Sequence, residues 1–87
     1  MEKFTVAMSV YKNDNTTDFA TALLSIYNQT CPPDEIILVI DGPIPEIMHN
    51  TINSLKEKIG IIKVVSFKEN RGHAAARQAG LENSSYE

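Results

Sequence analysis

The sequence predicts an α/β fold in which strands and helices alternate along one chain of 87 residues. Residues 35–40 form an almost wholly apolar run that Asp41 and Gly42 end, which is typical of a strand buried on both faces of a parallel sheet. Two further segments rich in β-branched residues, 4–10 and 61–67, precede and follow it. Amphipathic stretches with helical spacing fill the gaps, so the predicted order is β-α-β-α-β-α.

The first strand leads into a polar cluster, residues 12–17, whose Asn and Thr side chains can cap a helix. Apolar residues then recur at helical spacing, and this helix is predicted to end near Gln29. Pro32 and Pro33 prevent it from continuing. The second strand follows directly, so strand, helix and strand fit within about 40 residues, the size of a right-handed crossover unit.

The second half of the chain repeats this alternation. Pro45 suits the first turn of an amphipathic helix, and Gly60 suits a left-handed cap at its end. After the third strand, the polar residues 68–72 break the pattern. Three consecutive alanines then favour a third helix that begins at Gly72 or His73.

The loops that leave the three strands are predicted to meet. In a parallel sheet each of these loops lies at the same edge, so residues 9–12, 41–43 and 68–72 should line one crevice. Asp41 would then place a carboxylate where it can accept hydrogen bonds from a ligand. The alternative is a solvated aspartate that opens an Asp-Gly turn.

Composition limits the function classes. The chain is 43% hydrophobic and 22% charged, as in ordinary soluble globular proteins, and its formal charge of -3 argues against a general grip on nucleic acid. The single cysteine, Cys31, cannot form an intrachain disulfide, which favours a reducing, cytoplasmic compartment. No signal peptide is recognisable, and no apolar segment approaches the ~20 residues that span a bilayer. A membrane anchor elsewhere in a longer parent protein stays open.

Four motifs occur in order along the chain: Met8-Ser-Val-Tyr-Lys-Asn13, Ser25-Ile-Tyr-Asn-Gln-Thr30, Glu35-Ile-Ile-Leu-Val-Ile-Asp-Gly42 and Glu69-Asn-Arg-Gly-His-Ala-Ala-Ala-Arg-Gln-Ala-Gly80. Together they resemble the N-terminal half of a family 2 glycosyltransferase with the GT-A fold. The resemblance implies a Rossmann-like, three-stranded parallel sheet in the order 3-2-1. It also implies that residues 1–87 are the nucleotide-sugar-binding half of a glycosyltransferase domain.

The resemblance implies an inverting enzyme that transfers a sugar from a nucleotide diphosphate donor, usually a UDP-sugar, to an acceptor hydroxyl. Tyr11 would lie against the base and Ser9 would offer its hydroxyl to the same ligand. Asp41 would accept the uracil imide N–H. Arg71 and Arg77 would approach the uracil or the diphosphate with a permanent positive charge.

Other interpretations of these residues stay open. Tyr11 could simply pack a loop against the sheet, and Arg71 could be a surface charge. Asn70 and Gly72 are interpreted as residues that shape the loop. His73 has no neighbouring ligand residue in the sequence, so a histidine on the helix surface is favoured over a metal ligand.

The chain departs from the family pattern at two levels. Ile40 stands where the family commonly has a first aspartate before Asp41, and Gln78 replaces the usual asparagine after Arg77. More important, no Asp-x-Asp occurs in the chain, and this is the element that holds Mn²⁺ or Mg²⁺ on the diphosphate. We therefore expect the metal ligands, the catalytic base and the acceptor site in a longer enzyme, and no turnover by this fragment alone.

The expected partners are a nucleotide diphosphate sugar and an acceptor glycan, lipid or other hydroxyl compound, with no nucleic acid. The alternative function is a non-catalytic α/β interaction or nucleotide-binding module. An Asp-x-Asp encoded shortly after residue 87 would favour the enzyme. The family's strand order also places a further strand beside residues 4–10. Without it, that edge is predicted to invite self-association into a homo-oligomer.

Overall fold

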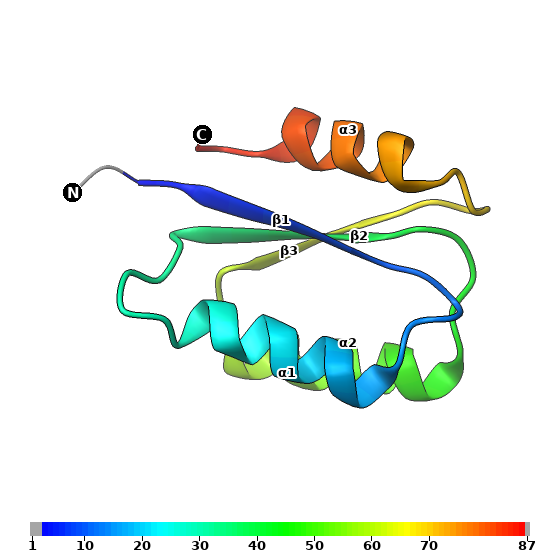
Figure 1. Cartoon of the computed structure of the whole chain (residues 1–87), viewed down its shortest axis with the longest axis horizontal. Helices are drawn as coiled ribbons and strands as arrows, with labels where there is room; N and C mark the ends of the chain where they lie inside the picture. The colour runs from blue at the N-terminus through cyan, green and yellow to red at the C-terminus, as the bar shows by residue number, and fades with distance from the viewer. Residues whose placement is uncertain (1–2, 87) are drawn as a thin grey trace.

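The computed structural model describes residues 3–86 and confirms the predicted α/β alternation (Figure 1). The three strands are parallel and lie in the order β1-β2-β3, which is the predicted order. The arrangement is that of a Rossmann-like half of a GT-A fold. The elements are β1 (Thr5–Val10), α1 (Thr16–Tyr27), β2 (Glu35–Ile40), α2 (Glu46–Lys58), β3 (Ile62–Ser66) and α3 (His73–Asn83).

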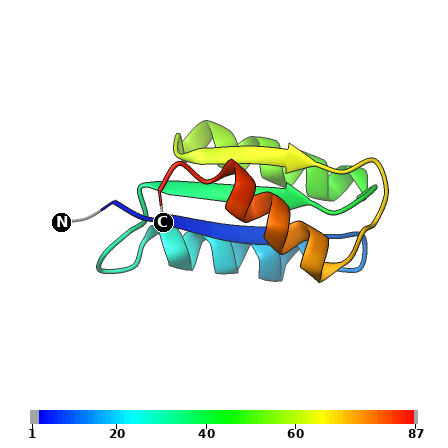
Figure 2. The ribbon, with the colours of Figure 1, turned by 90° about the horizontal axis from the view of Figure 1, so that it is seen from above.

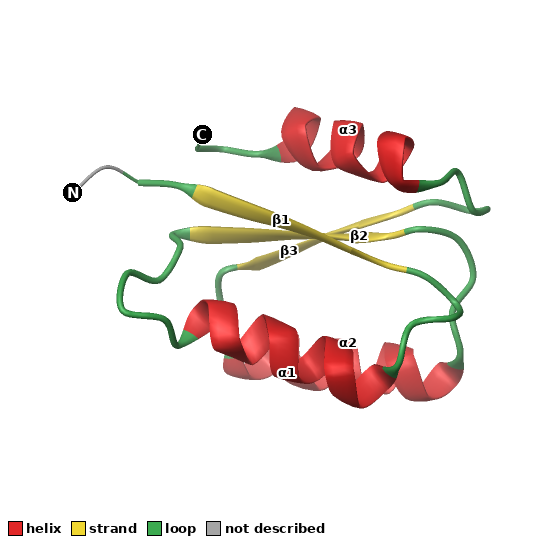
Figure 3. Cartoon of the chain, viewed as in Figure 1, coloured by secondary structure: helices red, strands yellow, loops and turns green. Residues whose placement is uncertain are grey.

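The molecule has three layers, with α1 and α2 on one face of the sheet and α3 on the other (Figure 3). Strand β2 lies in the middle and is buried on both faces, as its apolar run predicts. Alternate side chains of a strand point to opposite faces, and those of β2 divide accordingly. Its even-numbered residues join the core beneath α1 and α2, whereas Ile37 and Val39 face Ala76 of α3.

The two faces are packed very differently. The larger core lies between the sheet, α1 and α2, and its buried members are Val10, Phe19, Leu23, Ile36, Leu38, Ile40, Met48, Ile52, Leu55 and Ile59. The buried cluster under α3 consists of Ile37, Val39 and Ala76, with Val65, Phe67 and Ala79 packed against it. Helix α3 therefore lies on the sheet through small side chains, and Gly80 allows its backbone to come close to Ala7.

The helix ends follow local chemistry with one correction. The Asn15 side chain accepts a hydrogen bond from the Asp18 N–H, so the predicted polar cluster does cap α1, which ends at Tyr27. The predicted left-handed cap at Gly60 is wrong, because Gly42 and Gly72 are the glycines with positive φ. Helix α2 instead ends at Lys58, and the extended backbone of its cap residue, Ile59, leads into the turn before β3.

The parallel register brings the loops after all three strands to one edge of the sheet, as predicted (Figure 2). Val10 pairs with Ile40, and Ile40 pairs with Ser66, so the strands end side by side. The outer side of β1 has no neighbouring strand among residues 3–86. Since the Val10 carbonyl bonds inward to Asp41, the backbone groups of Thr5, Ala7 and Ser9 point outward along this edge.

We predict that Gly80→Val destabilises the chain by about 1–3 kcal/mol, because even a Cβ at position 80 would lie 2.9 Å from the Ala7 Cβ. Gly60→Ala is the control, since nothing lies within 4 Å of a Cβ there. The control should change the free energy of unfolding by less than about 1 kcal/mol. Urea unfolding followed by circular dichroism measures both, and equal stabilities of the two variants would contradict the close approach.

We predict that the free edge of β1 makes the chain associate with itself at high concentration. Ala7→Pro should suppress this association, because it removes an outward N–H without removing a bond between β1 and β2. Light scattering over a concentration series measures the association, and circular dichroism checks that the variant folds. A wild-type chain that stays monomeric at high concentration would show that this edge does not pair.

Candidate functional site

Asp41 is the most constrained polar residue of the predicted crevice, with only 6% of its surface exposed. Its carboxylate accepts hydrogen bonds from the Arg71 N–H at 2.7 Å and from the Gly72 N–H at 3.1 Å. The Asn70 side-chain amide donates to the same carboxylate at 3.3 Å and to the Asp41 carbonyl at 3.2 Å. The Asp41 N–H itself donates to the carbonyl of Val10 at 2.8 Å.

These bonds tie the end of β1, the end of β2 and the loop before α3 to one residue. The alternative of a solvated aspartate is therefore wrong. Gly42 is part of the same junction, because its φ is +92° and a Cβ there would lie 2.6 Å from the Asn70 nitrogen. The contacts of Asn70 and the positive φ of Gly72 agree with their interpretation as loop-shaping residues. A bond from Asp41 to a donor base stays a prediction.

A cavity of about 250 Å³ lies beside this junction, between β1 and the first turns of α3. Two of the predicted site residues, Ser9 and Arg77, line it from opposite elements. The other lining residues are Ala7, Met8, His73 and Ala76. The parallel topology thus brings a hydroxyl and a guanidinium that are far apart in the sequence to one hollow.

Tyr11 lies next to this cavity and contacts one of its lining residues. Its ring meets the His73 ring edge-on, with the centroids 6.4 Å apart and the planes at 71°. Asp14 holds the Tyr11 backbone in a tight loop, because its carboxylate accepts from the Tyr11 N–H and its own N–H donates to the Tyr11 carbonyl. The phenol is therefore held at the edge of the cavity. Its stacking on a base stays a prediction.

Arg71 lies elsewhere. Its guanidinium carbon is 4.9 Å from the centroid of the Phe67 ring, so its side chain covers the residue that follows β3. Its backbone N–H is committed to Asp41. The structure thus brings Ser9, Arg77 and Tyr11 together but directs the Arg71 side chain toward the far edge of the sheet, where its ligand contact remains a prediction.

His73 is the site residue that the sequence reasoning missed. It is the first residue of α3, lines the cavity and contacts Tyr11. Its position at a helix start, directly after the predicted crevice loop, was the available signal. Gly72 is the cap residue of this helix and has no side chain of its own, and its N–H donates to the Asp41 carboxylate. Because His73 lines the cavity, the start of α3 borders it.

A second hollow of about 300 Å³ shares Ser9 and Met8 with the first but opens on the α1 side of β1. Its other lining residues are Asp14, Asn15, Asp18, Phe19 and Ala22. Two carboxylates make this hollow unsuited to a diphosphate, because like charges repel. The cavity that contains Arg77 is the better candidate for an anionic ligand.

The described residues offer no ligand set for a metal. Within residues 3–86, no group of three or more His, Cys, Asp or Glu side chains could hold an ion. Residues 3–86 therefore offer no ligand set for the Mn²⁺ or Mg²⁺ that the sequence resemblance implies, and a metal in a longer enzyme stays a prediction. None of the described helices is both long enough and apolar enough to cross a membrane.

Comparison with known proteins identifies the family. The profile described as "Glycosyl transferase family 2" matches residues 5–87, which is nearly the whole chain. The chain belongs to the family 2 glycosyltransferases. This match confirms the predicted family, and the matched residues contain all four motifs. No solved structure matches significantly.

Three curated relatives support this membership. The chain is 35% identical over 79 residues to the UDP-Gal:alpha-D-GlcNAc-diphosphoundecaprenol beta-1,3-galactosyltransferase of Escherichia coli, covering 91% of the chain and 28% of that protein. It is 30% identical to the amylovoran biosynthesis glycosyltransferase AmsE of Erwinia amylovora, covering 95% of the chain and 31% of that protein. An uncharacterized glycosyltransferase of Haemophilus influenzae is 32% identical, with 98% and 32% covered. The chain thus spans less than a third of each relative.

We predict that Asp41→Asn lowers the free energy of unfolding by about 2–4 kcal/mol. The new side-chain nitrogen cannot accept the hydrogen bonds that the N–H groups of Arg71 and Gly72 now donate to the carboxylate. The control is Asp18→Asn, which removes an exposed carboxylate from the first turn of α1 and should cost less than about 1 kcal/mol. Urea unfolding measures both. A similar small loss for both variants would mean that the junction at Asp41 contributes little.

Proposed function

We propose that this chain is the donor-binding part of an inverting glycosyltransferase that transfers a sugar from a nucleotide diphosphate, in particular a UDP-sugar, to an acceptor hydroxyl. One observation carries the proposal: Ser9 and Arg77 line a single cavity at the edge where the strands end, with the rings of Tyr11 and His73 in contact beside it. Ligands of parallel α/β sheets bind at this edge.

The chemistry of the cavity suits a nucleotide diphosphate. Arg77 offers several donors and a permanent charge, and the start of α3, where His73 lines the cavity, lies at the positive end of the helix dipole. The aromatic rings of Tyr11 and His73 offer faces on which a base can stack. The volume of about 250 Å³ is slightly below the roughly 300–1,000 Å³ of small-molecule sites, which suits a pocket completed by other parts of a longer enzyme.

The relatives guide the proposal for donor and acceptor. The name of the Escherichia coli protein specifies UDP-Gal as its donor and a sugar on diphosphoundecaprenol as its acceptor. By extension, we propose a UDP-sugar donor and a lipid-linked or other sugar hydroxyl acceptor here. We further propose that the reaction takes place in the cytoplasm, at a membrane when the acceptor is lipid-linked, and the free, exposed Cys31 suits such a reducing compartment.

Catalysis is assigned to a longer enzyme of which residues 1–87 form the nucleotide-binding half. We place the Mn²⁺ or Mg²⁺ ligands outside residues 3–86, which hold no candidate metal site. The base that deprotonates the acceptor is placed there too, as the resemblance to the family implies. The 87-residue chain is therefore expected to bind the nucleotide without turning over a nucleotide sugar. Anomeric analysis of the product of the longer enzyme would test inversion.

We predict that the chain binds UDP and that Arg77→Gln weakens this binding about tenfold or more, through loss of a charge-assisted bond to the diphosphate. Lys56→Gln is the matched control, because it removes the same charge from α2 on the opposite face of the sheet. Calorimetric titration of each protein with UDP measures the affinity. Equal affinities of the two variants would contradict the assignment of the cavity.

Arg71→Gln distinguishes the contribution of Arg71 to UDP binding from that of Arg77. Because the Arg71 side chain lies over Phe67, this variant should weaken UDP binding less than Arg77→Gln does. Asp41 variants are less informative about the ligand, since the carboxylate holds the loop before α3 and a loss of binding could follow from a displaced loop.

A further inference from the structure

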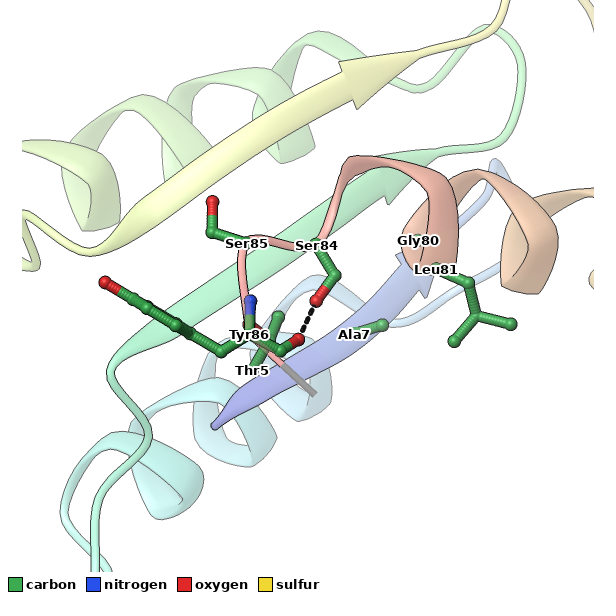
Figure 4. A pocket seen from close by; sticks show the side chains of 7 residues that line it. All are labelled: Thr5, Ala7, Gly80, Leu81, Ser84, Ser85 and Tyr86. Atoms are coloured by element: carbon green, nitrogen blue, oxygen red, sulfur yellow. Dashed lines mark hydrogen bonds between the residues drawn. The ribbon is translucent and has the colours of Figure 1, made fainter. Parts of the chain in front are cut away.

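Helix α3 carries two residues of the candidate site but has little apolar contact to hold it. Its buried residues are Ala76 and Gly80, which contribute one methyl group between them. Beside the close approach of Gly80 to Ala7, a hollow of about 350 Å³ lies between β1 and residues 80–86, so packing fills only part of the space at that end (Figure 4). The position of α3 along the sheet therefore depends on what fastens its two ends.

The C-terminal end is fastened by polar contacts of residues 84–86, which we call the strap. The Ser85 N–H donates to Glu35 Oε1 at 2.8 Å, and the Ser85 hydroxyl donates to Glu35 Oε2 at 3.0 Å. The Thr5 hydroxyl also donates to Glu35 Oε1 at 2.9 Å and accepts from the Tyr86 N–H at 3.2 Å. Both oxygens of one carboxylate thus hold the strap against the beginnings of β1 and β2.

All three strands contribute to this fastening. Just before the strap, Lys63 of β3 donates to the carbonyl of Asn83 at 3.4 Å. Within the strap, the Ser84 hydroxyl bonds to the Tyr86 carbonyl, which keeps the segment in a compact turn (Figure 4). The segment therefore crosses the sheet from β3 over β2 to β1, and Glu35 of the central strand makes the most contacts with it.

The two ends of α3 are fastened in the same way, to opposite ends of one strand. Glu35 is the first residue of β2, and Asp41 directly follows its last. A strand of six residues spans about 20 Å, and a helix of eleven residues spans about 16 Å. Helix α3 and its flanking segments thus fit between the two carboxylates, each of which binds backbone N–H groups next to the helix.

We propose that Glu35 is a positioning residue for the candidate site: through the strap it fixes α3 along the sheet, and so holds His73 and Arg77 beside Ser9. The ligand of that site is taken from the proposed function, whereas the coupling between the two ends of the helix stands on the contacts alone.

The ionisation of Glu35 agrees with this role. The hydrogen bond from the Ser85 N–H is the main cause that lowers the Glu35 pKa from its ordinary 4.5. Partial burial raises the pKa, whereas the hydroxyls of Thr5 and Ser85 and the charge of Lys63 lower it further. Because the pKa is lowered in the folded chain, the contribution to stability is complete above the unfolded value. It is lost as the pH falls below 4.5 through the folded value. Lys3, which lies 5.5 Å from the centre of the Tyr86 ring, is a further cation near the strap.

The test compares Glu35→Gln with Glu82→Gln, which makes the same charge change on α3 at a carboxylate bonded to Gln78. In Glu35→Gln, amide resonances of residues 73–77 should shift in NMR spectra of the free chain. Hydrogen exchange of α3 amides should also accelerate about tenfold relative to those of β2, because the helix opens locally. Glu82→Gln should leave both unchanged. Resonance changes confined to residues 5, 35 and 84–86 would overturn the proposal.

A pH titration adds a readout that a purely local role would not produce. Below pH 4.5, resonances of residues 73–77 in the wild type should follow the protonation of Glu35. That step should vanish in Glu35→Gln. Persistence of the same steps in both proteins would overturn the proposal.

Two further measurements keep the outcome interpretable. If Glu35→Gln does not fold, Ser85→Ala removes one hydroxyl donor and should produce smaller shifts at the same residues. UDP affinity should fall several-fold in Glu35→Gln and stay constant in Glu82→Gln. Failure of the wild type to bind UDP would contradict the proposed function, and the NMR shifts of the free chain would still decide the role of Glu35.

Discussion

The junction at Asp41 is the contact on which the site depends. Because β2 is central and buried on both faces, the residue that follows it emerges where the other strands also end. Its carboxylate accepts the N–H groups of Arg71 and Gly72, so the start of α3 lies beside the end of β1. Without these bonds, the backbone donors before α3 would be left without their acceptor, and nothing comparable would fix where the helix begins.

The two faces of the sheet divide stability and function between them. The face under α1 and α2 buries ten apolar residues in one cluster and supplies most of the apolar burial. The face under α3 buries three, and the helix contributes alanines and a glycine to it. Helix α3, which carries Arg77, is held chiefly by polar contacts at its two ends. Elements with few buried apolar contacts open most easily, so we expect α3 to open before the main core does. A binding site on such an element can adjust to a ligand at little cost to the main core.

The edge position of β1 explains why the three hollows described above lie beside it. Residues of β1 line each of the three cavities described above, one under each half of α3 and one beside α1. An edge strand has a neighbouring strand on one side only. On the outer side of β1, the helices above and below the sheet therefore have no strand between them. The candidate site is therefore open on the side of β1, in a chain that spans 28–32% of its curated relatives.

The sequence by itself determined the fold class. It also determined that the loops after the three strands meet at one edge of the sheet and that Asp41 lies at that edge. These follow from local properties: apolar periodicity, proline and glycine breaks, and the common direction of parallel strands. Only the tertiary structure decided that the backbone N–H of Arg71 donates to the Asp41 carboxylate. It also decided that the Arg71 side chain lies over the Phe67 ring and that the His73 ring contacts the Tyr11 ring. Gly60 shows the same limit at short range, because a helix can end in extended backbone as well as in a left-handed turn. Side chains some 30 residues apart, such as Asp41 and the loop at Arg71, acquire partners only when the strands and helices pack, and no local pattern encodes that choice.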